Sequence, residues 1–122
     1  MITNSKKNNI SQFYTNTITT VQGSFTAENQ FSEEDYMTID SGRTVNITMT
    51  RFYTNAPVVV NTILNLVKDS SVVVTGTILA GQKTIVNNTS AFSFIDGEKL
   101  QIKFVSGDSQ VEFNATTTGT IN

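Results

Sequence analysis

The chain of 122 residues contains no cysteine, no histidine and no tryptophan, and it has a single proline. Without cysteine it has no disulfides and no thiol nucleophile, and without histidine it also lacks the other common ligand of zinc sites. The fold must therefore be held together by its core alone. A chain of this length forms one domain and buries roughly two thirds of the surface that its unfolded state exposes.

Charge is scarce as well. Only 15% of the residues are charged, and the net charge is -2. The largest basic cluster is Lys6-Lys7, whereas nucleic acids and anionic membranes bind larger groups of Lys and Arg. No stretch approaches the ~20 apolar residues of a membrane helix, and the first residues lack the apolar run of a signal peptide. We expect no nucleic-acid or membrane partner, and synthesis in a cytoplasm without a signal peptide.

The polar residues that are present belong mainly to one class, since more than a third of the chain is Thr, Asn or Ser. Threonine, like the abundant Val and Ile, is β-branched and suits a pleated sheet, and no segment has helical periodicity. Short apolar segments recur roughly every eight to twelve residues between turn-forming residues, as in sandwiches. We predict an all-β fold: one jelly-roll or β-sandwich domain of about eight strands at residues 13–122, after an extended N-terminal arm at residues 1–12.

The clearest strand lies at residues 44–52, where apolar and polar residues alternate. This pattern predicts a strand with one buried face and one exposed face. The predicted buried residues are Val45, Ile47 and Met49, and the predicted exposed residues are Asn46, Thr48 and Thr50.

Three further local predictions come from glycine, proline and aspartate. Residues 58–67 form a long strand that begins just after Pro57. Gly76 marks a bulge or bend within a strand at residues 72–79. Asp96-Gly97 favours a hairpin that joins strands at residues 91–95 and 100–105.

Acidic residues provide no convincing catalytic or metal site. Glu33-Glu34-Asp35 are consecutive in a loop, whereas catalytic carboxylates usually converge from different strands. A group of acids near turns leaves an incidental calcium site open, although turn aspartates also form local hydrogen bonds. These acids are Asp40, Asp69, Asp96, Glu98 and Asp108. No nucleophile motif is present, so we expect neither an enzyme nor a cofactor.

Small β-sandwiches also include carbohydrate-binding modules, which commonly stack sugar rings on exposed Trp or Tyr. Here tryptophan is absent, and Tyr14, Tyr36 and Tyr53 are the only tyrosines. The eight phenylalanines are expected in the core. A sugar-binding module therefore stays as an alternative function.

Three segments carry a resemblance to a known family. They are NITMTRFYTNAPVVVNTIL at 46–64, LAGQKTIV at 79–86 and the closing residues 119–122. Together they resemble subunits of bacterial endospore appendages, the pilus-like fibres of Bacillus spores. The resemblance implies a jelly roll that stacks by sheet augmentation, with an N-terminal arm reaching into a neighbour, at the position of residues 1–12. Well-known appendage subunits are cross-linked through cysteines, so this chain resembles a cysteine-free type.

The leading hypothesis is therefore a self-assembling fibre subunit on the spore surface, whose only partners are copies of itself. Ile2, Ile10, Phe13 and Tyr14 are the predicted anchors of the arm on the next subunit. A phage virion protein, such as a decoration or fibre-tip jelly roll, is the first alternative. It predicts a closed oligomer where the fibre subunit predicts a filament.

Overall fold

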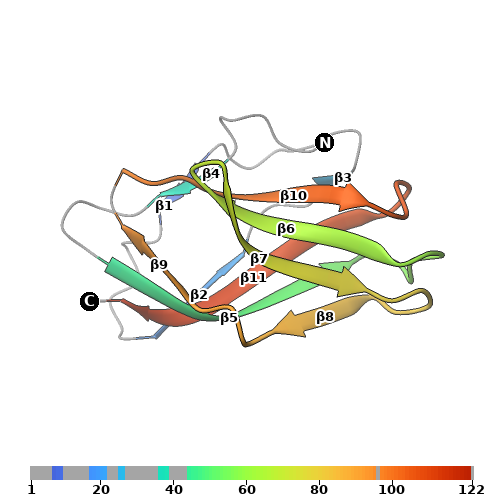
Figure 1. The fold of residues 1–122 in the computed structure, drawn as a ribbon, viewed down its shortest axis with the longest axis horizontal. Helices are drawn as coiled ribbons and strands as arrows, with labels where there is room; N and C mark the ends of the chain where they lie inside the picture. Colours follow the sequence, from blue (N-terminus) through green and yellow to red (C-terminus); the bar gives the residue numbers. More distant parts are fainter. Residues whose placement is uncertain are drawn as a thin grey trace.

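The computed structural model describes residues 7–9, 17–21, 25–26, 36–38, 44–95 and 97–121. These residues form two β-sheets that pack face to face, with no helix among them (Figure 1). Sheet A consists, in spatial order, of β1 (Lys7–Asn9), β4 (Tyr36–Thr38), β10 (Leu100–Ser106), β6 (Thr62–Lys68) and β7 (Ser71–Ile78).

Sheet B is built around two long strands, β5 (Thr44–Thr54) and β11 (Glu112–Ile121). Two short strands pair with the far side of β11, namely β2 (Thr17–Val21) and β3 (Phe25–Thr26). Two others pair with the far side of β5, namely β8 (Thr84–Asn87) and β9 (Phe92–Ile95). Strand β2 is described from Thr17, and residues 13–16 at the start of the predicted domain lie outside the described residues.

The strand order is that of a jelly roll. Sheet B reads β2-β11-β5-β8 and sheet A reads β4-β10-β6-β7, with β1 added beside β4. Successive strands alternate between the two sheets, except at the connections β2–β3, β6–β7 and β8–β9, which stay within one sheet. The last strand, β11, lies beside β2, the first strand of sheet B. Neighbouring strands within each sheet pair antiparallel, except that β1 pairs with β4 in parallel. The predicted fold class is confirmed.

The core lies between the two sheets and is almost entirely aliphatic and aromatic. Strands β5, β6, β7, β10 and β11 contribute most of it, largely through alternate residues, as half-buried antiparallel strands do. Phe104 of β10 and Phe113 of β11 join the layers through rings 6.0 Å apart. The largest fully buried side chains are Phe52, Phe113, Ile47, Leu64, Leu66, Ile78, Leu100, Ile102 and Val45.

One residue of β5 has no partner in the ladder to β11. Thr118 pairs with Met49 and Gly119 pairs with Ile47, so Thr48 is an extra residue and forms a β-bulge. The Thr48 hydroxyl donates a hydrogen bond to the Thr118 carbonyl (Oγ1···O 3.3 Å). A Cβ on Gly119 would collide with the Asn46 carbonyl, so the closely approaching chains require glycine there.

The bulge reverses the face of β5 that points into the core. Val45 and Ile47, before it, are buried as predicted. Beyond it the prediction is wrong: Met49 lies on the outer face, and Thr50 is only 1% exposed. An added residue shifts a period-two pattern by one position, which moves every later side chain to the opposite face. The buried residues after the bulge are Thr50, Phe52 and Thr54.

The long strand predicted at residues 58–67 is also wrong in its first part. The ladder begins at Thr62, and residues 55–61 form a loop. Val58 exchanges backbone hydrogen bonds with the β7–β8 loop, donating to Gln82 O (3.0 Å) and accepting from Gly81 N (2.7 Å). The Val59 amide donates to the Asp108 carboxylate (3.1 Å). These loop partners replace the strand ladder.

Gly76 serves close packing, and the bulge predicted there lies elsewhere. The pairing of β6 with β7 shifts between Leu66 and Val67, which leaves Val73 as the extra residue. A Cβ on Gly76 would overlap the Phe52 ring from the opposite sheet and approach Ile85 Cγ2 to 2.9 Å. Gly76 therefore makes room for the largest side chain of the core.

The turn predicted at Asp96-Gly97 exists, but it does not join a hairpin. Gly97 has a φ of 92°, and Glu98 N donates to Ile95 O (3.1 Å); Asp96 itself lies outside the described residues. Strand β9 pairs with β5 in sheet B, and β10 pairs with β6 in sheet A. The connection therefore crosses between the sheets.

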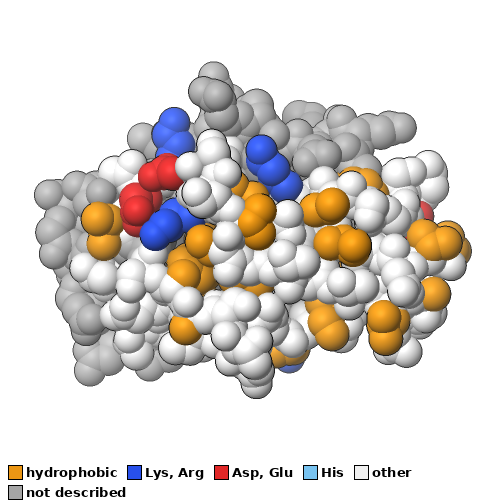
Figure 2. All heavy atoms as spheres, viewed as in Figure 1, with side chains coloured by type: hydrophobic (Ala, Val, Ile, Leu, Met, Phe, Trp, Pro, Cys, Tyr) orange, Lys and Arg blue, Asp and Glu red, His pale blue; other side chains and the backbone are white. Residues whose placement is uncertain are grey.

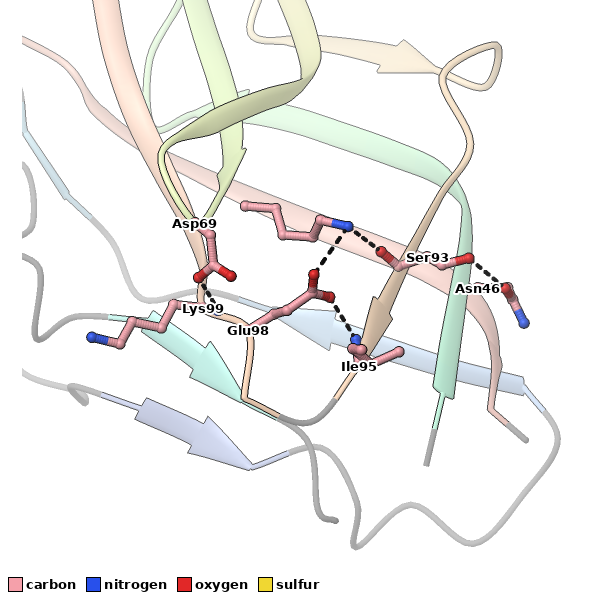
Figure 3. A network of polar contacts seen from close by, with 7 residues as sticks. Asn46, Asp69, Ser93, Ile95, Glu98 and Lys99 are labelled. Carbon is pink, nitrogen blue, oxygen red and sulfur yellow. Dashed lines mark hydrogen bonds and ion pairs between the residues drawn. The ribbon is translucent and has the colours of Figure 1, made fainter. Parts of the chain in front are cut away.

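A polar network joins the sheets near this crossing (Figure 3). The Lys68 ammonium forms an ion pair with Glu98 (3.4 Å) and donates to Ser93 O (2.9 Å), and the Ser93 hydroxyl donates to Asn46 Oδ1 (3.0 Å). Asp69, at the β6–β7 turn, accepts from Lys99 N (2.9 Å). Side-chain contacts thus close one end of the sandwich.

We expect Thr50→Val to raise the free energy of unfolding by about 1 kcal/mol. The Thr50 hydroxyl is buried and has no hydrogen-bond partner within the described part of the chain, and valine replaces it with a methyl group of similar size. Urea denaturation followed by circular dichroism measures the change.

Thr62→Val is the matched control, because Thr62 is just as buried. Its hydroxyl donates to Val60 O (2.9 Å) and accepts from Asp108 N (3.0 Å). This variant should lose about 1–3 kcal/mol. Shifts of the same sign in both variants would contradict the explanation.

Gly119→Ala should lower the free energy of unfolding by about 3 kcal/mol or more, because the new methyl group meets backbone that has no room to move. The neighbouring Thr120→Ala changes an exposed side chain and should stay within about 0.5 kcal/mol of the parent. Equal stability of the two variants, measured by the same denaturation, would show that the bulge does not require glycine.

Candidate functional site

The outer face of sheet B is hollowed over β5, β8 and β11. The hollow has a volume of about 630 Å³ and opens to solvent, which is within the size range of small-ligand sites. Its lining residues are Met49, Arg51, Tyr53, Thr54, Lys83, Thr84, Thr116 and Thr118.

The bulge brings these side chains together. Because it reverses the alternation of β5, Met49, Arg51 and Tyr53 point outward along one line. Thr118 and Thr116 of β11 lie opposite Met49 and Arg51 in the ladder. Directly paired residues have Cβ atoms about 4.5–5.5 Å apart, so the hydroxyls border the row on that side. On the other side, Thr84 of β8 lies opposite Tyr53.

Two cationic side chains line the hollow. The Arg51 and Lys83 side chains are exposed. Neither forms an ion pair or a side-chain hydrogen bond within the described residues, whereas Lys68 is paired with Glu98. No described carboxylate lines the hollow. The two cations that the structure describes in the hollow therefore favour an anionic ligand.

Tyr53 takes part in two hollows. It lines the main hollow and also a smaller one of about 80 Å³, which Asn55, Glu112 and Asn114 border. The Tyr53 hydroxyl accepts a long contact from Thr116 Oγ1 (3.5 Å), which helps to orient the half-buried ring. Tyr53 is one of the three tyrosines that the sequence offers for sugar stacking, and the structure places it in a hollow.

A second surface feature is an apolar loop end, where the β5–β6, β7–β8 and β10–β11 loops meet (Figure 1). Val59, Val60 and Leu79 are 76%, 48% and 54% exposed there, and Figure 2 shows hydrophobic side chains gathered at this end. The loops are well ordered by hydrogen bonds: Asp108 accepts from Val59 N (3.1 Å) and Gln110 N (3.0 Å). The exposed valines are therefore held in place.

The sheet edges differ in how far they are closed. Strands β7 and β8 run beside each other where the sheets meet, and Asn87 Nδ2 donates to the Thr75 carbonyl (3.0 Å). At the other side of sheet A, β1 pairs with β4 over Lys7–Asn9 and Tyr36–Thr38. No described strand pairs with the outer side of β1, so this edge is open within the described residues.

The predicted arm anchors Ile2, Ile10, Phe13 and Tyr14 lie outside the described residues. Within the predicted arm of residues 1–12, the structure describes only Lys7–Asn9, which pair with β4 of the same chain. The acidic cluster Glu33-Glu34-Asp35 and two of the turn acids, Asp40 and Asp96, are likewise outside the described part.

The remaining turn acids form local hydrogen bonds. Asp69 accepts from Lys99 N, Glu98 accepts from Ile95 N (2.9 Å), and Asp108 binds two loop amides. In the part of the chain that the structure describes, no three acidic residues gather as a metal-binding group. Among the same residues, no helix is long and apolar enough to cross a membrane.

Sequence reasoning missed Met49, Arg51 and Lys83 as lining residues. The alternation pattern placed Met49 in the core, and nothing near Arg51 or Lys83 in the sequence suggested that they meet. The sequence did contain one signal for the outward position of Arg51. Neighbouring residues of a strand point to opposite faces, so a charged residue directly before Phe52 indicates that Phe52 is buried and Arg51 is exposed.

No model of a protein family matches the sequence, and no curated protein matches it. Solved structures superpose on it with low identity. The globular domain of zebrafish complement 1qA protein gives a TM-score of 0.49 at 9% identity, covering 84% of this chain and 94% of that one. The core of Drosophila NLP gives 0.46 at 13% identity, covering 88% and 98%. A β-glucosidase from Paenibacillus barengoltzii gives 0.47 at 10% identity, covering 90% of this chain but only 10% of that one. These likenesses bear on neither activity nor partners.

Proposed function

We propose that the protein is a non-enzymatic structural subunit that assembles with copies of itself into an extracellular fibre. Assembly occurs by pairing of β-strands between subunits and by insertion of the N-terminal arm. The sequence resemblance to endospore appendage subunits supports a place on the spore surface, in a fibre without disulfide cross-links.

The observation that carries this proposal is the position of β1. The jelly roll is complete without it, and it is the one described strand that pairs in parallel. It extends sheet A by three residues, Lys7–Asn9, held by main-chain pairing with Tyr36–Thr38. Such pairing does not depend on which chain supplies the strand, so β1 of one subunit can pair with β4 of another.

The described contacts between β1 and the domain are few. In cis, β1 contacts chiefly β4, and β4 pairs with β10 through a single residue pair, Met37 with Leu100. A short strand at an edge opens at little cost in free energy. Exchange between subunits therefore loses few interactions.

The two ends of the sandwich suit a head-to-tail contact. The loop end presents Val59, Val60 and Leu79 to solvent, and burial of apolar surface stabilises by about 25 cal/mol per Å². The other end is closed by the polar network around Lys68 and Glu98. Unlike ends give a heterologous contact, which produces a filament when it does not close.

Electron microscopy of the purified full-length protein tests the proposal, and filaments are the expected result. Deletion of residues 1–12 should abolish them. The double variant Lys7→Pro/Asn8→Pro is a sharper test, because it removes two consecutive main-chain donors. Alternate residues of a strand point to opposite sides, so this variant disrupts β1 whichever side is used.

Lys7→Ala/Asn8→Ala is the matched control, because it removes the same side chains and keeps both amides. It should assemble as the parent does. Filaments of unchanged length from the proline variant would exclude β1 as the connector. A monomeric parent at high concentration would overturn the fibre proposal, and a closed oligomer in light scattering would favour a virion component.

A further inference from the structure

We infer that the hollow on the outer face of sheet B binds an acidic oligosaccharide, with Arg51 and Lys83 holding a carboxylate and Tyr53 contacting a sugar ring. This inference goes beyond the proposed fibre function and does not depend on it. It gives the surface of each subunit a ligand-binding role.

The first argument is charge. Among the basic side chains that the structure describes, Lys68, Lys99 and Lys103 have partners. Arg51 and Lys83 have none within the described residues, and both line the same hollow. A guanidinium presents paired N–H donors that match the two oxygens of a carboxylate, and an ammonium adds a mobile point charge.

The second argument is the mixture of hydroxyl groups and apolar surface. A sugar ring has hydroxyls at its rim and C–H groups on its faces. Thr84, Thr116 and Thr118 supply hydroxyl oxygens that can accept hydrogen bonds from the sugar. The Thr84 hydroxyl donates to Phe52 O (3.1 Å), which fixes its position and leaves its oxygen free to accept. Tyr53 and Met49 supply the apolar surface.

The third argument is shape. Most of the site is built on the paired strands β5, β8 and β11, with Lys83 directly before β8, and a backbone that is already in place lowers the entropy cost of binding. Tyr53 lines both the main hollow and the smaller one, and because Glu112 borders the smaller one, the carboxylate of the sugar belongs in the main hollow beside Arg51 and Lys83. A stable protein interface needs about 800 Å² on each partner with an apolar centre. Among the described lining residues, only Met49 and Tyr53 are large apolar groups, which favours the sugar.

Calorimetric titration of the full-length protein tests the inference with three acidic probes: tetragalacturonate, tetramannuronate and a hyaluronan tetrasaccharide. We expect at least one to bind with a Kd of roughly 0.1–1 mM. The neutral counterpart, the methyl ester of the acid that binds, keeps the sugar and removes its charge. It should bind at least tenfold more weakly.

Three variants locate the site. Arg51→Gln and Lys83→Gln should each weaken binding of the acid about tenfold, and Tyr53→Ala should weaken the acid and its ester alike. Lys103→Gln is the matched control, because it removes one positive charge from β10 in the other sheet. It should bind as the parent does. Thermal unfolding of each variant confirms that the fold is intact.

Three results would overturn the inference. They are no binding of any acid up to about 5 mM, equal binding of acid and ester, and binding that the Arg51 and Lys83 variants leave unchanged. A peptide of residues 29–38, which contains Glu33-Glu34-Asp35, should bind more weakly than the sugar. Tighter binding of this peptide would assign the hollow to a second copy of the chain instead. Filament formation plays no part in these outcomes, so they are separate from the fibre test.

Discussion

The bulge at Thr48 is the constraint on which the outer surface of sheet B depends. One extra residue in β5, opposite Gly119 of β11, changes which side chains face the core for the rest of the strand. Phe52 enters the core as a result and fills the space that Gly76 leaves in sheet A. Arg51 and Tyr53 turn outward in the same step. A local feature of main-chain pairing thus decides both the packing of the largest buried ring and the composition of the hollow.

The reversal of β5 at the bulge leaves a polar atom in the core, the Thr50 hydroxyl, without a hydrogen bond among the described residues. Thr50 is buried as a consequence of the shifted alternation, and its hydroxyl has no partner in the described part of the molecule. Buried hydroxyls without partners are uncommon because they lose hydration without replacement. Thr62 and Asp108 show the usual arrangement, in which buried polar atoms organise loops. Burial of Thr50 is therefore a side effect of the bulge, whereas Thr62 and Asp108 hold the loop end together.

The two proposed surfaces lie on different parts of the jelly roll. Strand pairing through β1 involves the β4 edge of sheet A, whereas the hollow lies on the open face of sheet B. Augmentation of a sheet edge covers main-chain groups and leaves the faces of the sheet accessible. A fibre built in this way would therefore repeat the hollow on every subunit. Weak binding at each site would then add up through multivalency.

Much of the fold was predictable from local patterns. Abundant β-branched residues, short apolar segments and regular turns predicted an all-β jelly roll or sandwich, and the strand order confirms it. The turns at Asp69-Ser70 and at Gly107 also follow local chemistry, with positive φ angles at all three residues. The predictions that failed concern Met49, Thr50, the start of β6 and the Asp96-Gly97 hairpin. Each required knowledge of a partner strand or loop far away in the sequence.

The sequence alone determined the all-β class and which residue types are available for chemistry, because alternation, β-branching and turn residues act over a few positions. Only the tertiary structure decided which face of β5 is buried, because the bulge depends on Gly119, 71 positions after Thr48. It likewise decided that Arg51 and Lys83 share a hollow, since β5 and β8, which Lys83 directly precedes, meet only through sheet pairing. Register between distant strands is a property of the packed sheets, and one residue of shift exchanges the inside of a strand for the outside.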